Sequence, residues 1–119
     1  MSFKPVTRSE VDVTVTAEPE WTPVRGNAMA SGDDAIDKAV EDAILQRLEQ
    51  GDTWAWAAVT VTVAWAGISA SAYLGCCSYA DEADFRQPGG YFDDLVDESL
   101  TSLNEELERL QLCLCTREA

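Results

Sequence analysis

Hydrophobic and polar positions along the chain alternate with two different periods, and each period predicts a different kind of element. Residues 11–17 alternate valine or alanine with polar side chains, which is the two-residue period of a half-buried strand. Residues 53–66 repeat this alternation over a longer stretch. Gly67 then marks a turn, and residues 68–79 alternate again. The pattern therefore predicts one strand near the N-terminus and a β-hairpin in the middle of the chain.

Two other segments carry apolar residues at the spacing of three to four that is typical of an amphipathic helix. The first begins after Asp33 or Asp34, either of which can cap a helix, and ends at Gly51. The second runs from about Tyr91 to Cys113. Its stripe has spacings of three and four, which is close to a heptad, and fits either a helix lying on a sheet or a seam between paired helices. The stripe consists of Phe92, Val96, Leu100, Leu103, Leu107, Leu110 and Leu114.

The element order strand, helix, strand, strand, helix predicts an α+β fold. We expect a small antiparallel sheet of about three strands with the two main helices packed on one face. The 119 residues form a single domain, with 1–10 as a candidate flexible arm and 113–119 as a candidate frayed end. The predicted core contains Val13, Val15, Ile36, Val40, Ile44, Leu48, Val59, Val61, Val63, Leu74, Val96, Leu100, Leu103 and Leu107.

The net charge of the chain favours some classes of binding partner and disfavours others. The chain has 22 acidic and 8 basic residues, a formal charge of −14. Residues 33–119 hold 18 of the acidic and 5 of the basic residues, so they carry −13 of this charge. Direct binding to nucleic acid or to an anionic membrane is disfavoured, because both require positive charge. The charge favours a partner with a basic surface, the alternative being that it serves solubility alone.

The sequence offers little material for catalysis or for a metal site. Histidine is absent, which removes the most common general base and metal ligand. Three acidic residues in 81–84 are the best carboxylate cluster, but they lack calcium-loop spacing and fit a solvated loop. Cys76, Cys77, Cys113 and Cys115 do not converge at the spacing of a zinc site, so we expect reduced, buried thiols. We expect no enzymatic activity, no cofactor and no metal.

Carboxylates on the two helices and two tryptophans form the candidate partner-binding set. Trp54 and Trp56 share the strand face opposite Val59, so they predict an exposed apolar patch. The alternative is that the loop from Glu20 to Gly32, with Trp21, folds over them. The candidate residues are Asp37, Glu41, Asp42, Asp94, Asp97, Glu98, Glu105, Glu108, Trp54 and Trp56.

Three stretches of the chain are familiar as a combination. They are residues 24–34 (VRGNAMASGDD), residues 51–56 (GDTWAW), and residues 74–94, which include LGCCSY and PGGYFDD. The combination resembles small hypothetical proteins of tailed phages and prophages of proteobacteria, a family without a known activity. The resemblance implies a setting, because small acidic phage proteins are often inhibitors of host defence, including anti-CRISPR and anti-restriction proteins.

Together these patterns predict a phage-type accessory protein in the host cytoplasm. We expect it to bind and inhibit a host protein, such as a nucleic-acid-handling defence complex, through an acidic surface, either with carboxylates in the place of DNA phosphates or without such mimicry. The alternative function is a non-catalytic structural or assembly module that acts as a homodimer. No segment has the apolar character of a signal peptide or of a membrane span.

Overall fold

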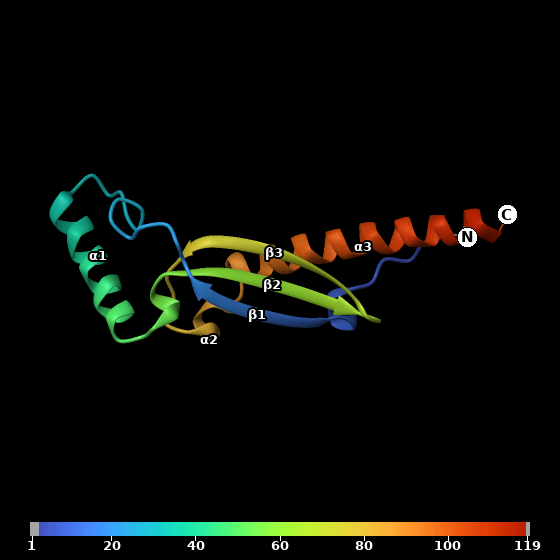
Figure 1. The fold of residues 1–119 in the computed structure, drawn as a ribbon, viewed down its shortest axis with the longest axis horizontal. Helices are drawn as coiled ribbons and strands as arrows, with labels where there is room; N and C mark the ends of the chain where they lie inside the picture. The colour runs from blue at the N-terminus through green and yellow to red at the C-terminus, as the bar shows by residue number, and fades with distance from the viewer. Residues whose placement is uncertain (1–2, 119) are drawn as a thin grey trace.

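The computed structural model describes the backbone of residues 3–118 and the side chains of residues 3–112. Its sheet has three antiparallel strands in the order β1 (Asp12–Pro19), β2 (Ala57–Trp65) and β3 (Ile68–Cys77). Two long helices, α1 (Asp34–Glu49) and α3 (Tyr91–Glu118), and a short helix α2 (Glu82–Phe85) complete the α+β fold (Figure 1). Single turns of 3-10 helix precede β1 and β2, namely η1 (Arg8–Glu10) and η2 (Thr53–Ala55). The predicted fold class and sheet are confirmed.

A tight turn joins β2 to β3. Ala66 and Gly67 have φ angles of 51° and 81°, and Trp65 pairs with Ile68 across the turn. Positive φ at both central positions defines a type I′ turn, whose twist matches that of the two flanking strands. The sequence marked this turn correctly through Gly67, and the pairing of β2 with β3 follows from it.

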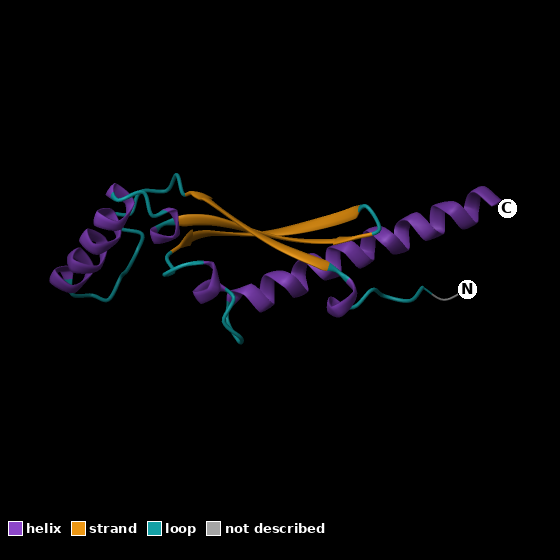
Figure 2. Ribbon diagram, turned by 90° about the horizontal axis from the view of Figure 1, so that it is seen from below, coloured by secondary structure: helices purple, strands orange, loops and turns teal. Residues whose placement is uncertain are grey.

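The sheet buries one face, and α3 covers it. Val59, Val61 and Val63 of β2 are almost completely buried against Val96 and Leu103 of α3. Figure 2 shows α3 running along the underside of the sheet, where it contacts β2 and β3. The apolar stripe of residues 92–107 is therefore the sheet-facing side of this helix, as the first of its two interpretations predicted.

The other long helix does not lie on that face. We expected both helices there, but α1 packs beside the ends of the strands, against η2 and the loop that precedes it (Figure 1). Its Ile44 joins Val24, Ala55 and Trp56 in a second, smaller core. A three-stranded sheet is about 14 Å wide, and one helix is about 10 Å across, so α3 alone fills the face.

The position of α1 corrects part of the predicted core. Ile36 is 50% exposed instead of buried, because the first turn of α1 extends beyond the second core. The two core clusters contain the remaining thirteen predicted residues, either fully buried or packed at the edges. Helical period alone indicates which face of a helix is apolar, and it does not show how far the neighbouring structure extends.

The N-terminal segment lies along α3. The backbone N–H of Val6 donates to the side-chain oxygen of Asn104 at 2.7 Å, and the Asn104 amide donates back to the Val6 carbonyl at 3.0 Å. Val6 is buried, and Arg8 pairs with Asp93 at 2.9 Å. Residues 3–10, the candidate flexible arm, are thus attached to the helix. The side chains of 113–119, the candidate frayed end, lie outside the described residues.

The molecule is elongated. Its extents are 66 × 25 × 24 Å, and its radius of gyration is 18.9 Å. A compact domain of this length has a radius of gyration of about 13.5 Å. The elongation arises because α1 lies beyond one end of the sheet, where it runs across the long axis, while α3 extends past the other end (Figure 1). Residues on α1 and on the second half of α3 are therefore far apart.

Candidate binding surface

The outer side of α3 carries a continuous row of carboxylates. Positions 94, 97, 98, 105 and 108 fall within an arc of about 100° on a helix of 3.6 residues per turn. The buried residues Val96 and Leu103 lie on the opposite side, so the row faces away from the sheet. All five acidic residues are exposed, and we call them the acidic row: Asp94, Asp97, Glu98, Glu105 and Glu108.

No positive charge interrupts the acidic row. Residues 91–108 contain no lysine or arginine, and Arg109, on the flank of the helix, pairs with Glu106. The row extends over about 21 Å, because each helical residue advances the chain by about 1.5 Å. Five of the eight carboxylates in the predicted set therefore form one surface, which a basic partner can contact along its length.

The three predicted carboxylates on α1 do not belong to the acidic row and instead bind the loop that precedes the helix. Glu41 is only 8% exposed, so its predicted surface position is wrong. It accepts hydrogen bonds from the backbone N–H of Gly26 at 2.6 Å and from the Arg25 guanidinium at 3.2 Å. Asp42 also pairs with Arg25, and the carboxylate of Asp37 accepts from the backbone and hydroxyl of Ser31. These carboxylates hold the loop of residues 20–32 against α1.

The exposed tryptophan pair that the alternation predicted does not exist. Trp56 is 3% exposed, and its indole N–H donates to the Thr22 carbonyl at 2.6 Å. Trp54 packs against Tyr79 and Phe85, with ring centroids 6.4 and 5.6 Å away. The strand begins only at Ala57, so the two tryptophans precede it and do not share a strand face.

For Trp56 the alternative prediction is correct, because the loop of residues 20–32 covers its side chain. The covering residues are not the ones that we expected. Val24 and the Thr22 carbonyl cover the indole, while Trp21 is 95% exposed. Trp54 is covered from the other side by the segment that contains α2. The sequence signal for this arrangement was the high content of proline and glycine in residues 19–32, which indicates an ordered loop and gives no direction for its side chains.

The acidic cluster at residues 81–84 caps a helix. The side chain of Asp81 accepts from the backbone N–H of Asp84 at 2.8 Å, and Asp84 accepts from Ala80 at 2.9 Å. Glu82 pairs with Arg86 at 3.0 Å. In the part of the chain that the structure describes, no group of three or more cysteine or acidic side chains converges to hold a metal ion. The carboxylates of this cluster thus have local structural partners.

The two cysteines of β3 occupy different environments. Cys77 is buried, and burial raises the pKa of its thiol to about 11, so it is a poor nucleophile. Cys76 is exposed, which corrects the expectation of a buried thiol. Its φ angle of 55° departs from that of a regular strand, and its backbone N–H donates to the Glu20 carboxylate at 2.8 Å. The side chains of Cys113 and Cys115 lie outside the described residues.

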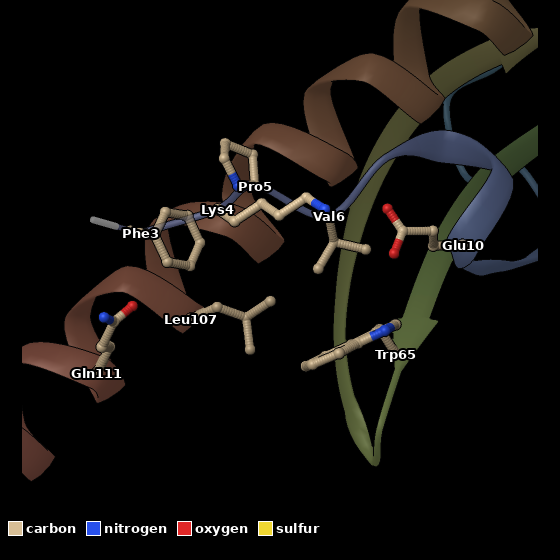
Figure 3. Close-up of a pocket in the computed structure, with 8 residues that line it drawn as sticks. All are labelled: Phe3, Lys4, Pro5, Val6, Glu10, Trp65, Leu107 and Gln111. Atoms are coloured by element: carbon tan, nitrogen blue, oxygen red, sulfur yellow. The ribbon is translucent and has the colours of Figure 1, made fainter. Parts of the chain in front are cut away.

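A shallow hollow lies where the N-terminal segment passes the tip of the hairpin. It measures about 320 Å³, and Phe3, Val6, Trp65 and Leu107 surround it (Figure 3). Among the described residues that line it, the charged ones are Lys4 and Glu10, which have opposite signs. The hollow is at the lower limit of size for a small-molecule site and brings few polar groups together, so it does not define a ligand.

Fold and surface together define a small acidic α+β protein whose most distinctive exposed feature is the acidic row. No protein-family model matches the chain, and no curated protein or solved structure matches it either. Among the described residues, no helix combines the length and the apolar character that crossing a bilayer requires.

Proposed function

We propose that this protein is a non-catalytic binding protein that uses the acidic row to occupy a basic surface of a host protein. The observation that carries the proposal is the one-sided charge of α3: five exposed carboxylates on one face and no basic residue between positions 91 and 108. The helix rests on the sheet through its opposite side, so the row is presented on a rigid support.

The length of the acidic row suggests which basic surfaces it fits. Phosphates follow one another at about 3.4 Å of axial rise along one strand of DNA. A row of about 21 Å therefore spans roughly six phosphates of a single strand. A basic channel that normally contacts the backbone of one nucleic-acid strand, alone or within a duplex, is the matching partner, and occupation of that channel would inhibit the protein that contains it. The resemblance to phage proteins agrees with inhibition of a host defence complex.

Electrostatics also sets the expected character of binding. Exposed carboxylates contribute little individually, and salt screens them over about 10 Å at 0.1 M ionic strength. Their main effect is on the association rate, which rises when complementary charges steer the encounter. We therefore expect fast association that slows steeply as the salt concentration rises.

The test compares two variants with the same change of net charge. The first neutralises three members of the acidic row and keeps Asp94, which stabilises the helix N-terminus: Asp97→Asn, Glu105→Gln and Glu108→Gln. The control neutralises three exposed carboxylates that lie elsewhere and outside the first turn of a helix: Asp12→Asn, Glu18→Gln and Glu49→Gln. Each immobilised protein is incubated with a bacterial lysate at low and at high salt, and retained proteins are identified by mass spectrometry. A captured protein is then tested for displacement of labelled single-stranded DNA.

The proposal expects one or more nucleic-acid-binding proteins that the wild type and the control retain at low salt and the row variant does not. It also expects the wild type to displace DNA from the captured protein. If the row variant and the control retain the same lysate proteins equally well, binding depends on net charge alone and not on the position of the carboxylates. Retention that persists at high salt, or that leaves DNA binding of the captured protein intact, also contradicts the proposal.

A further inference from the structure

Over residues 68–74, the outer edge of β3 lacks the features that normally prevent an edge strand from pairing. Soluble proteins protect such edges with charged residues, proline, β-bulges, short strands or covering elements. The irregularity in the pairing of β3 lies beyond this stretch, between Leu74 and Cys77. β3 is ten residues long and contains neither a charged residue nor proline, in a chain in which a quarter of the residues are charged. The opposite edge, β1, carries Asp12, Glu18 and Pro19. One edge of this sheet is protected, and the other is open.

The hairpin turn determines which backbone groups point outward from β3. In a two-residue type I′ hairpin, the pair that closes the turn is hydrogen-bonded, and hydrogen-bonded pairs then alternate along the strands. Trp65 and Ile68 close this turn, so Ser69, Ser71 and Tyr73 direct their N–H and C=O groups to the free edge. Within residues 3–118 these groups have no hydrogen-bond partner. α3 packs on one face of the sheet (Figure 2), whereas these groups point sideways, in the plane of the sheet.

We propose that β3 of a second copy pairs antiparallel with this edge, so that two molecules form a dimer with a continuous six-stranded sheet. A two-fold axis at Ser71 pairs Ser71 with its own copy and Ser69 with Tyr73. All three outward-facing residues then exchange both of their hydrogen bonds with the partner strand. The strand is thus complementary to itself in one register.

The charge distribution favours a second copy as the occupant. A chain with a net charge of −14 can approach itself only through a surface that is free of like charge. Ser69, Ser71 and Tyr73 bring none, and Tyr73 adds a largely exposed ring to the contact. The acidic row faces away from the sheet on the far side of α3, so the two rows remain outside the joined strands.

The flank of α3 that would approach the partner carries one ion pair, with Glu98 of the acidic row at its border. Asn104 and Asp93 contact the N-terminal segment, which marks the flank on the β1 side. The other flank, toward β3, carries Ser102 and the Glu106–Arg109 ion pair. Because α3 contacts β3 and β2, the joined sheet would bring the two α3 helices near each other and add to the contact area.

The test uses two substitutions whose side chains occupy matched positions on opposite edges of the sheet. Ser71 and Thr14 both pair with Thr62 of β2, from opposite edges and on the same face. Ser71→Lys places a charge at the centre of the open edge, and Thr14→Lys places the same charge on the protected edge. Sedimentation equilibrium across the micromolar range measures the mass, and circular dichroism confirms that each variant is folded.

We expect the wild type and Thr14→Lys to reach twice the monomer mass of 13.0 kDa. We expect Ser71→Lys to raise the dissociation constant at least ~10-fold, although added lysine lowers the overall repulsion. A wild type that stays monomeric overturns the proposal, as does a Ser71→Lys variant that dimerises normally. Dissociation of both variants would instead indicate contact through the open sheet face and would also overturn it.

Hydrogen exchange of the wild type tests the same edge without a substitution. With rising protein concentration, the amides of Ser69, Ser71 and Tyr73 should become protected, because strand pairing removes them from water. The outward amides of β1, which belong to Val13 and Val15, should exchange at an unchanged rate. Absence of concentration-dependent protection in β3 contradicts the proposal even if the protein dimerises.

Discussion

At the scale of single residues, the same amino-acid type has different roles at different positions. Glu41 is buried and holds a loop, whereas Glu105 is exposed on the acidic row. Trp56 is a core residue, whereas Trp21 is almost fully exposed. Residue type sets which interactions a side chain can make. The surrounding structure decides whether that side chain is buried and stabilises the fold or is exposed to solvent. Two substitution pairs measure this difference.

Truncation of Leu103 should destabilise the protein strongly. Its side chain is completely buried between α3 and the sheet, so Leu103→Ala removes apolar contacts and leaves a cavity. The expected loss in the free energy of unfolding is about 2–5 kcal/mol. Urea denaturation measures it, with Leu112→Ala as the control, because Leu112 is 63% exposed and should change stability by less than ~0.5 kcal/mol. Similar losses in both variants would show that burial on α3 is assigned incorrectly.

The tryptophans of the second core provide the other pair. Trp56→Ala should lower the free energy of unfolding by about 3–5 kcal/mol, since it empties a buried site and leaves the Thr22 carbonyl without its donor. Trp21→Ala should leave thermal stability almost unchanged, because Trp21 has nearly no packing to lose. A melting temperature that depends more on Trp21 than on Trp56 would contradict this assignment.

At the scale of elements, single carboxylates connect segments that are distant in the sequence. Glu20, just after β1, accepts hydrogen bonds from the backbone N–H groups of Cys76 in β3 and of Thr22. Gly75 leaves room for this contact, because a Cβ atom there would lie 2.9 Å from the Glu20 carboxylate. These bonds, first of all the one from Cys76, lower the pKa of the Glu20 carboxyl below its usual 4.5.

The lowered pKa makes this connection dependent on pH. A carboxyl whose folded-state pKa is depressed contributes stability above the unfolded-state value, and this contribution is lost as the pH falls through the folded-state pKa. The free energy of unfolding should therefore fall as the pH decreases below about 4.5, and Glu20→Gln should make that fall less steep. Urea denaturation at pH 6 and at pH 3 measures the difference between the two proteins. Identical pH profiles would show that Glu20 does not contribute.

At the scale of the whole molecule, two cores of unequal size lie along one axis. The larger core joins the sheet to α3, and the smaller one joins α1 to η2 and the loop before it. Few contacts connect α1 to the strands. The side chain of Arg47 donates instead to Asp52, which precedes η2, and to the carbonyl of Tyr79, which follows β3. Because the two cores are separate clusters, fewer buried contacts couple the unfolding of one end of the molecule to that of the other.

The unequal cores predict that α1 opens before the sheet. Native-state hydrogen exchange should show a lower free energy of opening for the amides of α1 than for those of β2, because α1 buries few residues. Ile44→Ala should lower the value for α1 further and change β2 much less, since the two cores share few contacts. Equal opening free energies in α1 and β2 would mean that the molecule unfolds as one unit.

Sequence and tertiary structure decided different properties of this protein. Local periodicity determined the elements, because side-chain alternation at Val59–Val63 and helical spacing at Val96–Leu103 depend only on neighbouring residues. The Gly67 turn and the exposed row of Asp97–Glu108 followed for the same reason. The position of α1 and the roles of Glu41, Trp54 and Trp56 did not follow. These features depend on the width of the sheet and on which loop contacts which side chain. Both are relations between segments that are distant in the sequence, so no local pattern contains them.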